Sequence, residues 1–183
     1  MTVHAVHVRP SGAYPAAKII FAGRTYPGVV GRGGVTKSKR EGDGATPVGC
    51  FSILRAYYRP DRIVGLDTRL PTSALEPADV WVDDPRDKNY NQPLKRSELE
   101  EGSSHEEMWR EDAIYDIVLD LSYNRNPASK GEGSAVFVHV AREENPASSP
   151  TDGCVALRRE HLVELLSLVT PDTLVCIHAQ GNP

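Results

Sequence analysis

Alternation of apolar and polar residues is the main pattern of the sequence, and it predicts a protein built mostly from β-strands. Short stretches in which Val, Ile, Phe, Tyr or Ala recur at every second position are typical of strands that bury one face. We expect such strands at Val3–Val8, Lys18–Ala22, Thr25–Val30, Val48–Tyr58, Asp79–Asp83, Ala113–Leu121, Ala135–Ala141 and Thr173–Ala179. The fold class that follows is mainly β.

One stretch has the helical period instead. Apolar residues of Arg158–Val169 recur at spacings of three and four, which predicts an amphipathic helix packed on the sheet; they are Leu162, Leu165, Leu166 and Val169. Thr170 and Pro171 would end it. Ser103 and Ser104, followed by two glutamates, are also compatible with the cap of a short helix that reaches Trp109.

Two polar segments lack either period. Gly31–Gly44 is rich in glycine and charge but has no phosphate-binding loop pattern, so we expect a mobile surface loop. Arg59–Gly102 contains many turn formers and one short strand. A segment of this length inside a compact domain is usually a lid or an insertion, and we expect 59–102 to overhang the functional site. The alternative is an insertion far from the chemistry.

Composition limits the class of protein. With 183 residues, of which 39% are hydrophobic, the chain is long enough for a single globular domain that spans 1–183. We expect no membrane span, and a net charge of −4 argues against a nucleic-acid binder. Three scattered cysteines predict neither a disulfide framework nor a zinc site, so Cys50 and Cys176 should be packing residues. The first residues show no signal-peptide pattern.

Candidate chemistry is concentrated near the C-terminal end. His139 lies at the end of the expected strand Ala135–Ala141, a polar loop follows at Glu143–Pro150, and the turn Thr151–Gly153 then presents Cys154. A thiol becomes a nucleophile when an imidazole takes its proton and backbone N–H groups stabilise the oxyanion that forms later. Histidine and cysteine separated by a loop that can bring them together are the residues this chemistry needs.

These residues resemble a known family. The sequence HVAR, the fifteen-residue step from His139 to Cys154 and the sequence SPTDGCVAL are similar to the signature of the L,D-transpeptidase (YkuD-type) catalytic domain. Residues 42–51, GDGATPVGCF, resemble the TPxGxF strand of the same family. Two positions depart from it: Asp152 stands where many members have His, and Ala156 where many have Arg or Asn.

The resemblance implies a β-sandwich and a cysteine acyltransferase that cleaves an L–D peptide bond of peptidoglycan stem peptides. Cys154 would be the nucleophile, His139 the base, and the N–H groups near Gly153 the oxyanion donors. A backbone carbonyl would orient the imidazole, because no third catalytic residue can be assigned. No metal or cofactor is implied. Further candidates for substrate contacts, each of which also has a purely structural reading, are Arg142, Thr151, Asp152 and Trp81.

Three alternatives remain open at this stage. Water in place of the acceptor amine would give a hydrolytic L,D-carboxypeptidase. A sortase-like peptidase also places His before Cys, but Arg158 follows the cysteine too closely to match the sortase arginine. A cell-wall-binding module without catalysis would have no use for a reactive Cys154. The family implies a periplasmic or cell-wall location, whereas the sequence leaves the cytoplasm open and does not predict an oligomeric state.

Overall fold

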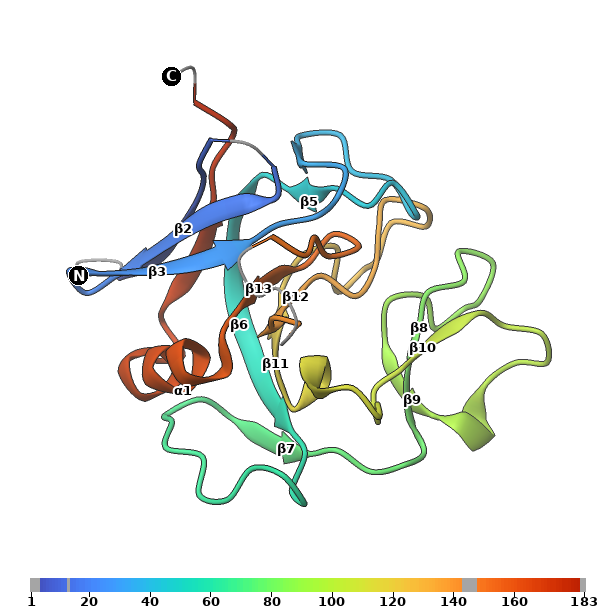
Figure 1. Ribbon diagram of the computed structural model, residues 1–183. Coiled ribbons are helices and arrows are strands. Elements are labelled where there is room, and N and C mark those ends of the chain that lie inside the picture. The colour runs from blue at the N-terminus through green and yellow to red at the C-terminus, as the bar shows by residue number, and fades with distance from the viewer. Residues whose placement is uncertain (1–3, 13, 143–147, 182–183) are drawn as a thin grey trace.

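A computed structural model describes residues 4–12, 14–142 and 148–181. Most of its strands belong to one nine-stranded sheet (Figure 1). In spatial order the strands are β11 (Ile117–Leu121), β12 (Phe137–Val140), β13 (Val155–Leu157), β3 (Arg24–Val29), β2 (Ala16–Phe21), β1 (Ala5–Pro10), β14 (Leu174–Ile177), β6 (Gly49–Tyr58) and β7 (Thr72–Ala74). The predicted mainly β fold is confirmed.

The sheet closes on itself through β6. Residues 49–52 of this strand pair with β14, whereas residues 53–58 pair with β11 at the far end of the strand order. The two layers expected of a β-sandwich are therefore parts of one continuous sheet that wraps around a single core. The only α-helix of the described residues, α1 (Arg159–Leu168), matches the predicted helix and buries Leu162, Leu165 and Leu166 in that core.

Strand β12 shows how the sheet separates its two faces. Val138 and Val140 belong to the core inside the sheet. Successive side chains of a strand point to opposite faces, so Phe137 and His139 lie on the outer face. There Phe137 packs with Trp81, Tyr115 and other residues of a second apolar cluster. The candidate site is built on this outer face.

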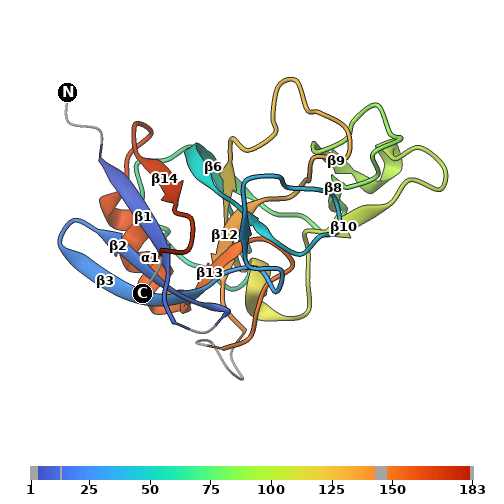
Figure 2. The ribbon, with the colours of Figure 1, turned by 90° about the horizontal axis from the view of Figure 1, so that it is seen from above.

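A second, smaller sheet lies beside the main body (Figures 1 and 2). It consists of β8 (Asp79–Val82), flanked by β9 (Pro93–Lys95) and β10 (His105–Glu107), with a 3-10 turn at Arg96–Glu98. The helix expected after Ser103 is wrong, because these residues form β10. An extended strand satisfies the free edge of β8, whose Val80, Trp81 and Val82 are wholly buried, and a helix would leave that edge unpaired.

The glycine-rich segment Gly31–Gly44, expected to be a surface loop, is largely exposed loop but also contains a short strand. β4 (Val35–Thr36) pairs with β5 (Thr46–Pro47), and the loop between them folds against the main body. Arg32, before β4, donates its backbone N–H to the Thr151 carbonyl, and Glu41 of the loop donates its N–H to the Gly131 carbonyl. The expected strand at 113–121 begins with a 3-10 turn, Ala113–Tyr115, before β11.

Cys50 and Cys176 form a disulfide bond, with 2.05 Å between the sulfur atoms. They lie opposite each other on β6 and β14. The expectation of two packing thiols was wrong. The two cysteines are 126 residues apart, and only the register of β6 and β14 brings them together, so no local sequence pattern predicts the bond. In the part of the chain that the structure describes, we find no helix with the length and hydrophobicity to cross a membrane.

Candidate active site

A cavity of about 470 Å³ lies on the outer face of the main sheet, beside the ends of β12 and β13. It brings together six residues that the sequence analysis selected: His139, Arg142, Thr151, Asp152, Gly153 and Cys154. Trp81, the seventh, is absent from its walls. The indole of Trp81 is 1% exposed and donates a hydrogen bond to Asn91 Oδ1 at 2.9 Å. Trp81 is therefore a core residue, and the expected substrate contact is wrong.

Cys154 is the free cysteine of the chain and lies directly before β13. Its thiol donates to the Ala135 carbonyl at 3.1 Å and accepts a hydrogen bond from the Phe137 N–H at 3.4 Å. We expected an exposed thiol, but the residue is 8% exposed because the stretch before β12 covers it. Burial, reinforced by the carboxylate of Glu106, raises the pKa of the thiol to about 12.

His139 projects from β12 into the same cavity and is 6% exposed. Its Nδ1 lies 2.9 Å from the Val140 carbonyl oxygen. A carbonyl can only accept, so Nδ1 carries the hydrogen and Nε2 keeps a free lone pair. The sequence-based expectation that a backbone carbonyl orients this ring is thus confirmed. Burial lowers the pKa of the imidazole to about 4, so near neutral pH the ring is an uncharged base.

The turn before Cys154 is held by hydroxyl groups. Thr151 Oγ1 donates to the Cys154 carbonyl at 2.6 Å and accepts the Gly153 N–H at 3.2 Å. Thr46 Oγ1 reaches the same carbonyl at 3.3 Å. Gly153 adopts φ +131°, and a Cβ there would approach the Ala45 carbonyl oxygen to 2.9 Å. Thr151 therefore shapes the turn, and the N–H of Gly153 is engaged within it.

The two charged candidates lie at the rim of the cavity. Asp152 is exposed and forms an ion pair with Arg32. Arg142 is exposed as well. Residues 143–147 of the predicted loop Glu143–Pro150 lie outside the described residues, whereas Ser149 and Pro150 line the cavity.

Carboxylates that the sequence analysis did not select form one wall. Glu106, from β10, is half-buried there, and burial raises its pKa to about 7; the nearby carboxylates of Asp83 and Glu41 act in the same direction, whereas Tyr115 and Arg110 oppose it. The pKa of Asp83 is also raised, chiefly by burial. These residues come from separate segments, and no local pattern relates them.

The expected lid stays a prediction. Segment 59–102 is not structureless, since it contains β7, β8 and β9. It contributes one residue, Asp83, to the wall of the cavity. Within the described ranges, no three His, Cys, Asp or Glu side chains are grouped closely enough to bind a metal ion.

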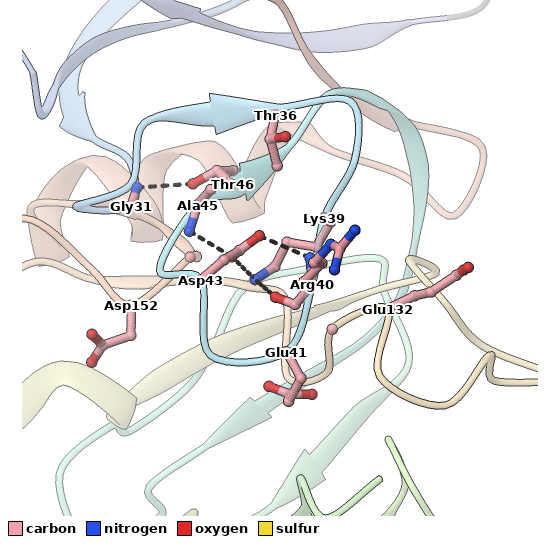
Figure 3. Close-up of polar contacts among 12 residues, drawn as sticks. Gly31, Thr36, Lys39, Arg40, Glu41, Asp43, Ala45, Thr46, Glu132 and Asp152 are labelled. Atoms are coloured by element: carbon pink, nitrogen blue, oxygen red, sulfur yellow. Dashed lines mark hydrogen bonds and ion pairs between the residues drawn. The ribbon is translucent and has the colours of Figure 1, made fainter.

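Lys39 is the other unforeseen residue of this site. It comes from the segment that we took for a surface loop, yet its side chain is 5% exposed and lines the cavity with Cys154. It forms an ion pair with Asp43 (Figure 3). A lysine is rarely buried unless its charge is paired. The ion pair with Asp43 therefore explains how the cavity wall accommodates a buried lysine.

The sequence matches the model of the L,D-transpeptidase catalytic domain family, YkuD, over residues 22–177. A search of curated proteins gives no significant match. Among solved structures, an L,D-transpeptidase from Mycobacterium smegmatis is 15% identical, with 95% of this chain and 58% of that one covered and a TM-score of 0.42. L,D-transpeptidase 1 of Mycobacterium tuberculosis is 14% identical, with 96% and 62% covered and a TM-score of 0.39.

The chain therefore spans about three fifths of the length of these two mycobacterial chains. The match over residues 22–177 covers most of the chain and includes both His139 and Cys154.

Proposed function

Because the chain belongs to the L,D-transpeptidase catalytic domain family, we propose that it is a cysteine acyltransferase that acts on peptidoglycan stem peptides. The observation that carries the proposal is the shared cavity of Cys154 and His139. A free thiol and an imidazole with an available Nε2 are the nucleophile and the base of this chemistry.

In the first step, Nε2 of His139 takes the thiol proton as Cys154 Sγ attacks the carbonyl of the L–D peptide bond. In the free protein both groups are neutral, because burial raises the pKa of the thiol and lowers that of the imidazole. The proton therefore moves together with the attack, and a stable thiolate–imidazolium pair does not form beforehand. The product of this step is a tetrahedral oxyanion bonded to sulfur.

Collapse of this intermediate breaks the C–N bond, and the imidazolium of His139 gives its proton to the departing amine. A thioester on Cys154 remains. An amine of a second stem peptide then attacks the thioester, His139 takes the proton of that amine, and the thiol is restored as the new amide forms. Water in place of the amine would give hydrolysis instead.

The oxyanion needs hydrogen-bond donors that do not move during the reaction. We assign this role to the N–H groups of the turn at Gly153 and Cys154. For Gly153 this requires the hydrogen bond to Thr151 Oγ1 to be exchanged for one to the substrate, since its N–H is engaged in the free protein.

Mass spectrometry of the intact protein tests the proposal. Incubation with a disaccharide-tetrapeptide should add the mass of the donor without its terminal residue, and peptide mapping should place it on Cys154. Addition of an amine acceptor should then discharge the adduct. The variant Cys154→Ala is the control, and Glu111→Gln, at an acidic residue outside this cavity, is a matched variant that should behave as the wild type. Absence of an adduct on a folded wild-type protein would refute the proposal.

A further inference from the structure

Lys39 places a positive charge in the cavity wall, near the turn Thr151–Gly153 that precedes Cys154. Its side chain is 5% exposed, whereas that of its partner Asp43 is 26% exposed. Nζ donates to Asp43 Oδ1 at 2.5 Å and to the Arg40 carbonyl at 3.0 Å. An ammonium group has three hydrogens, so one donor remains beyond these two bonds.

The hydrogen bonds of the Asp43 carboxylate lie within its own loop (Figure 3). Its oxygens accept the N–H groups of Arg40 and Ala45, each at 2.8 Å. Burial alone would raise the pKa of Asp43, but the hydrogen bonds from Lys39, Ala45 and Arg40 hold it below its ordinary value. Water screens this negative end of the ion pair more than it screens the buried ammonium, so the pair presents a net positive potential to its buried side.

Two glycines make room for the lysine. A Cβ on Gly133 would lie 2.8 Å from Lys39 Cγ and 3.0 Å from Cε. A Cβ on Gly153 would lie 3.5 Å from Nζ. The ammonium thus lies next to the space that a side chain on the residue before Cys154 would occupy, and the stem of the lysine fills the slot that Gly133 leaves open.

Burial and the carboxylate of Glu106 oppose negative charge on the Cys154 sulfur, whereas the hydrogen bond from the Phe137 N–H and the Lys39 ammonium favour it. The imidazole of His139 and the phenol of Tyr115 share the cavity wall and are uncharged near neutral pH. Lys39 is therefore the cation that offsets the cost of negative charge in a buried site.

We propose that Lys39 is a positioning residue that acts through the Gly153–Cys154 turn: its fixed positive charge favours negative charge on the Cys154 sulfur and holds the turn against the loop. This inference rests on the proposed role of Cys154 as the nucleophile. It assigns a function to the charged loop Gly31–Gly44, which the catalytic pair alone leaves unexplained.

The two sides of the ion pair provide the test. Lys39→Met and Asp43→Asn each break the pair, so a purely structural role would change the reactivity of Cys154 in the same direction. An electrostatic role requires opposite directions, because Lys39→Met removes the positive charge, whereas Asp43→Asn leaves it uncompensated. The measurement is the rate of iodoacetamide alkylation of Cys154 near neutral pH, with the Cys50–Cys176 disulfide intact.

We expect Lys39→Met to slow alkylation about tenfold, as a rise of about one in the thiol pKa would do. Asp43→Asn should accelerate it, and Lys39→Arg, which keeps the charge, should stay closer to the wild type than Lys39→Met does. Lys37→Met, at an exposed lysine of the same loop outside the cavity, should leave the rate unchanged.

Equal rates, or slowing by both Lys39→Met and Asp43→Asn, would overturn the proposal. Should Lys39→Met not fold, the double variant Lys39→Met/Asp43→Asn is compared with Asp43→Asn, and it must be the slower of the two. The assay needs no substrate. Failure of the donor peptide to acylate Cys154 would therefore overturn the proposed function and leave the result on Lys39 intact.

Discussion

The backbone N–H of Phe137 donates a hydrogen bond to the sulfur of Cys154, with 3.4 Å between the two atoms. Phe137 begins β12, and His139 lies two residues further along the same strand. One strand therefore supports the nucleophile through its backbone and carries the base on its side chain. A shift of β12 along its partners would therefore displace the donor to the sulfur and the imidazole together, relative to Cys154.

Replacing the thiol separates chemistry from packing. Cys154→Ala should abolish the acyl adduct and leave a folded protein, because the substitution removes one buried sulfur atom at a cost of roughly 1 kcal/mol in the free energy of unfolding. Cys154→Ser should be nearly inactive as well, since a hydroxyl is a much weaker nucleophile. Intact-mass analysis and thermal unfolding measure the two effects. Retained acylation in Cys154→Ala would mean that another residue is the nucleophile.

Removal of the imidazole should slow the reaction of Cys154. In His139→Ala the thiol loses its proposed general base, so alkylation by iodoacetamide near neutral pH should fall by ~10²–10⁴-fold, the range typical of general bases. His161→Ala, at a histidine outside the cavity, is the matched control. Equal rates for wild type and His139→Ala from pH 5 to 9 would remove His139 from the mechanism.

His139 should also make the stability of the fold depend on pH. Its pKa falls from 6.5 to about 4 on folding, so between these values the unfolded chain binds a proton that the folded protein does not. Above pH 6.5 the neutral ring contributes roughly 3 kcal/mol to the free energy of unfolding, and this contribution is lost as the pH falls toward 4. Urea unfolding of wild type and His139→Asn measures it: the difference between their pH profiles should be confined to this window.

Glu106 should lower the reactivity of the Cys154 thiol in a pH-dependent manner. Its carboxylate raises the pKa of Cys154, and its own pKa is about 7. Glu106→Gln should therefore accelerate alkylation by severalfold above pH 7, whereas at pH 5 the wild-type side chain is already neutral and the two rates should converge. Glu107→Gln, on the same strand but paired with Arg96 outside the cavity, is the control. A constant ratio of rates between pH 5 and 9 would contradict this assignment.

The disulfide should stabilise the fold without affecting the chemistry. It joins residues 126 positions apart, so its loss should lower the free energy of unfolding by roughly 2–5 kcal/mol. The variant Cys50→Ala/Cys176→Ala isolates this effect from the reactivity of Cys154. Denaturant unfolding should show the loss, and alkylation of Cys154 should proceed at the wild-type rate. An unchanged unfolding midpoint in the double variant would mean that the bond does not form in the protein.

Sequence patterns predicted those features that depend on neighbouring residues. The period of two located the main strands, the helical period located α1, and the short step from His139 to Cys154 led to two residues that share the cavity. Lys39 and Glu106 could not be found in this way, because segments far apart in the sequence, a loop and strand β10, bring them to the cavity. The same reason hid the Cys50–Cys176 pair and the strand at His105–Glu107, whose conformation is imposed by the open edge of β8.

The pairing of β14 sets the order in which the molecule can assemble. This strand lies between β1 and β6, both from the first third of the chain, so the ring of strands cannot close until residues 174–177 are available. Until then β1 and one half of β6 keep an unpaired edge, which exposes the growing chain to mispairing. Contacts between such distant segments are also slow to form, on the order of milliseconds to seconds in β-rich domains. Synthesis of β14, and not formation of the turn Thr151–Gly153, therefore times the completion of the sheet on which the cavity around Cys154 is built.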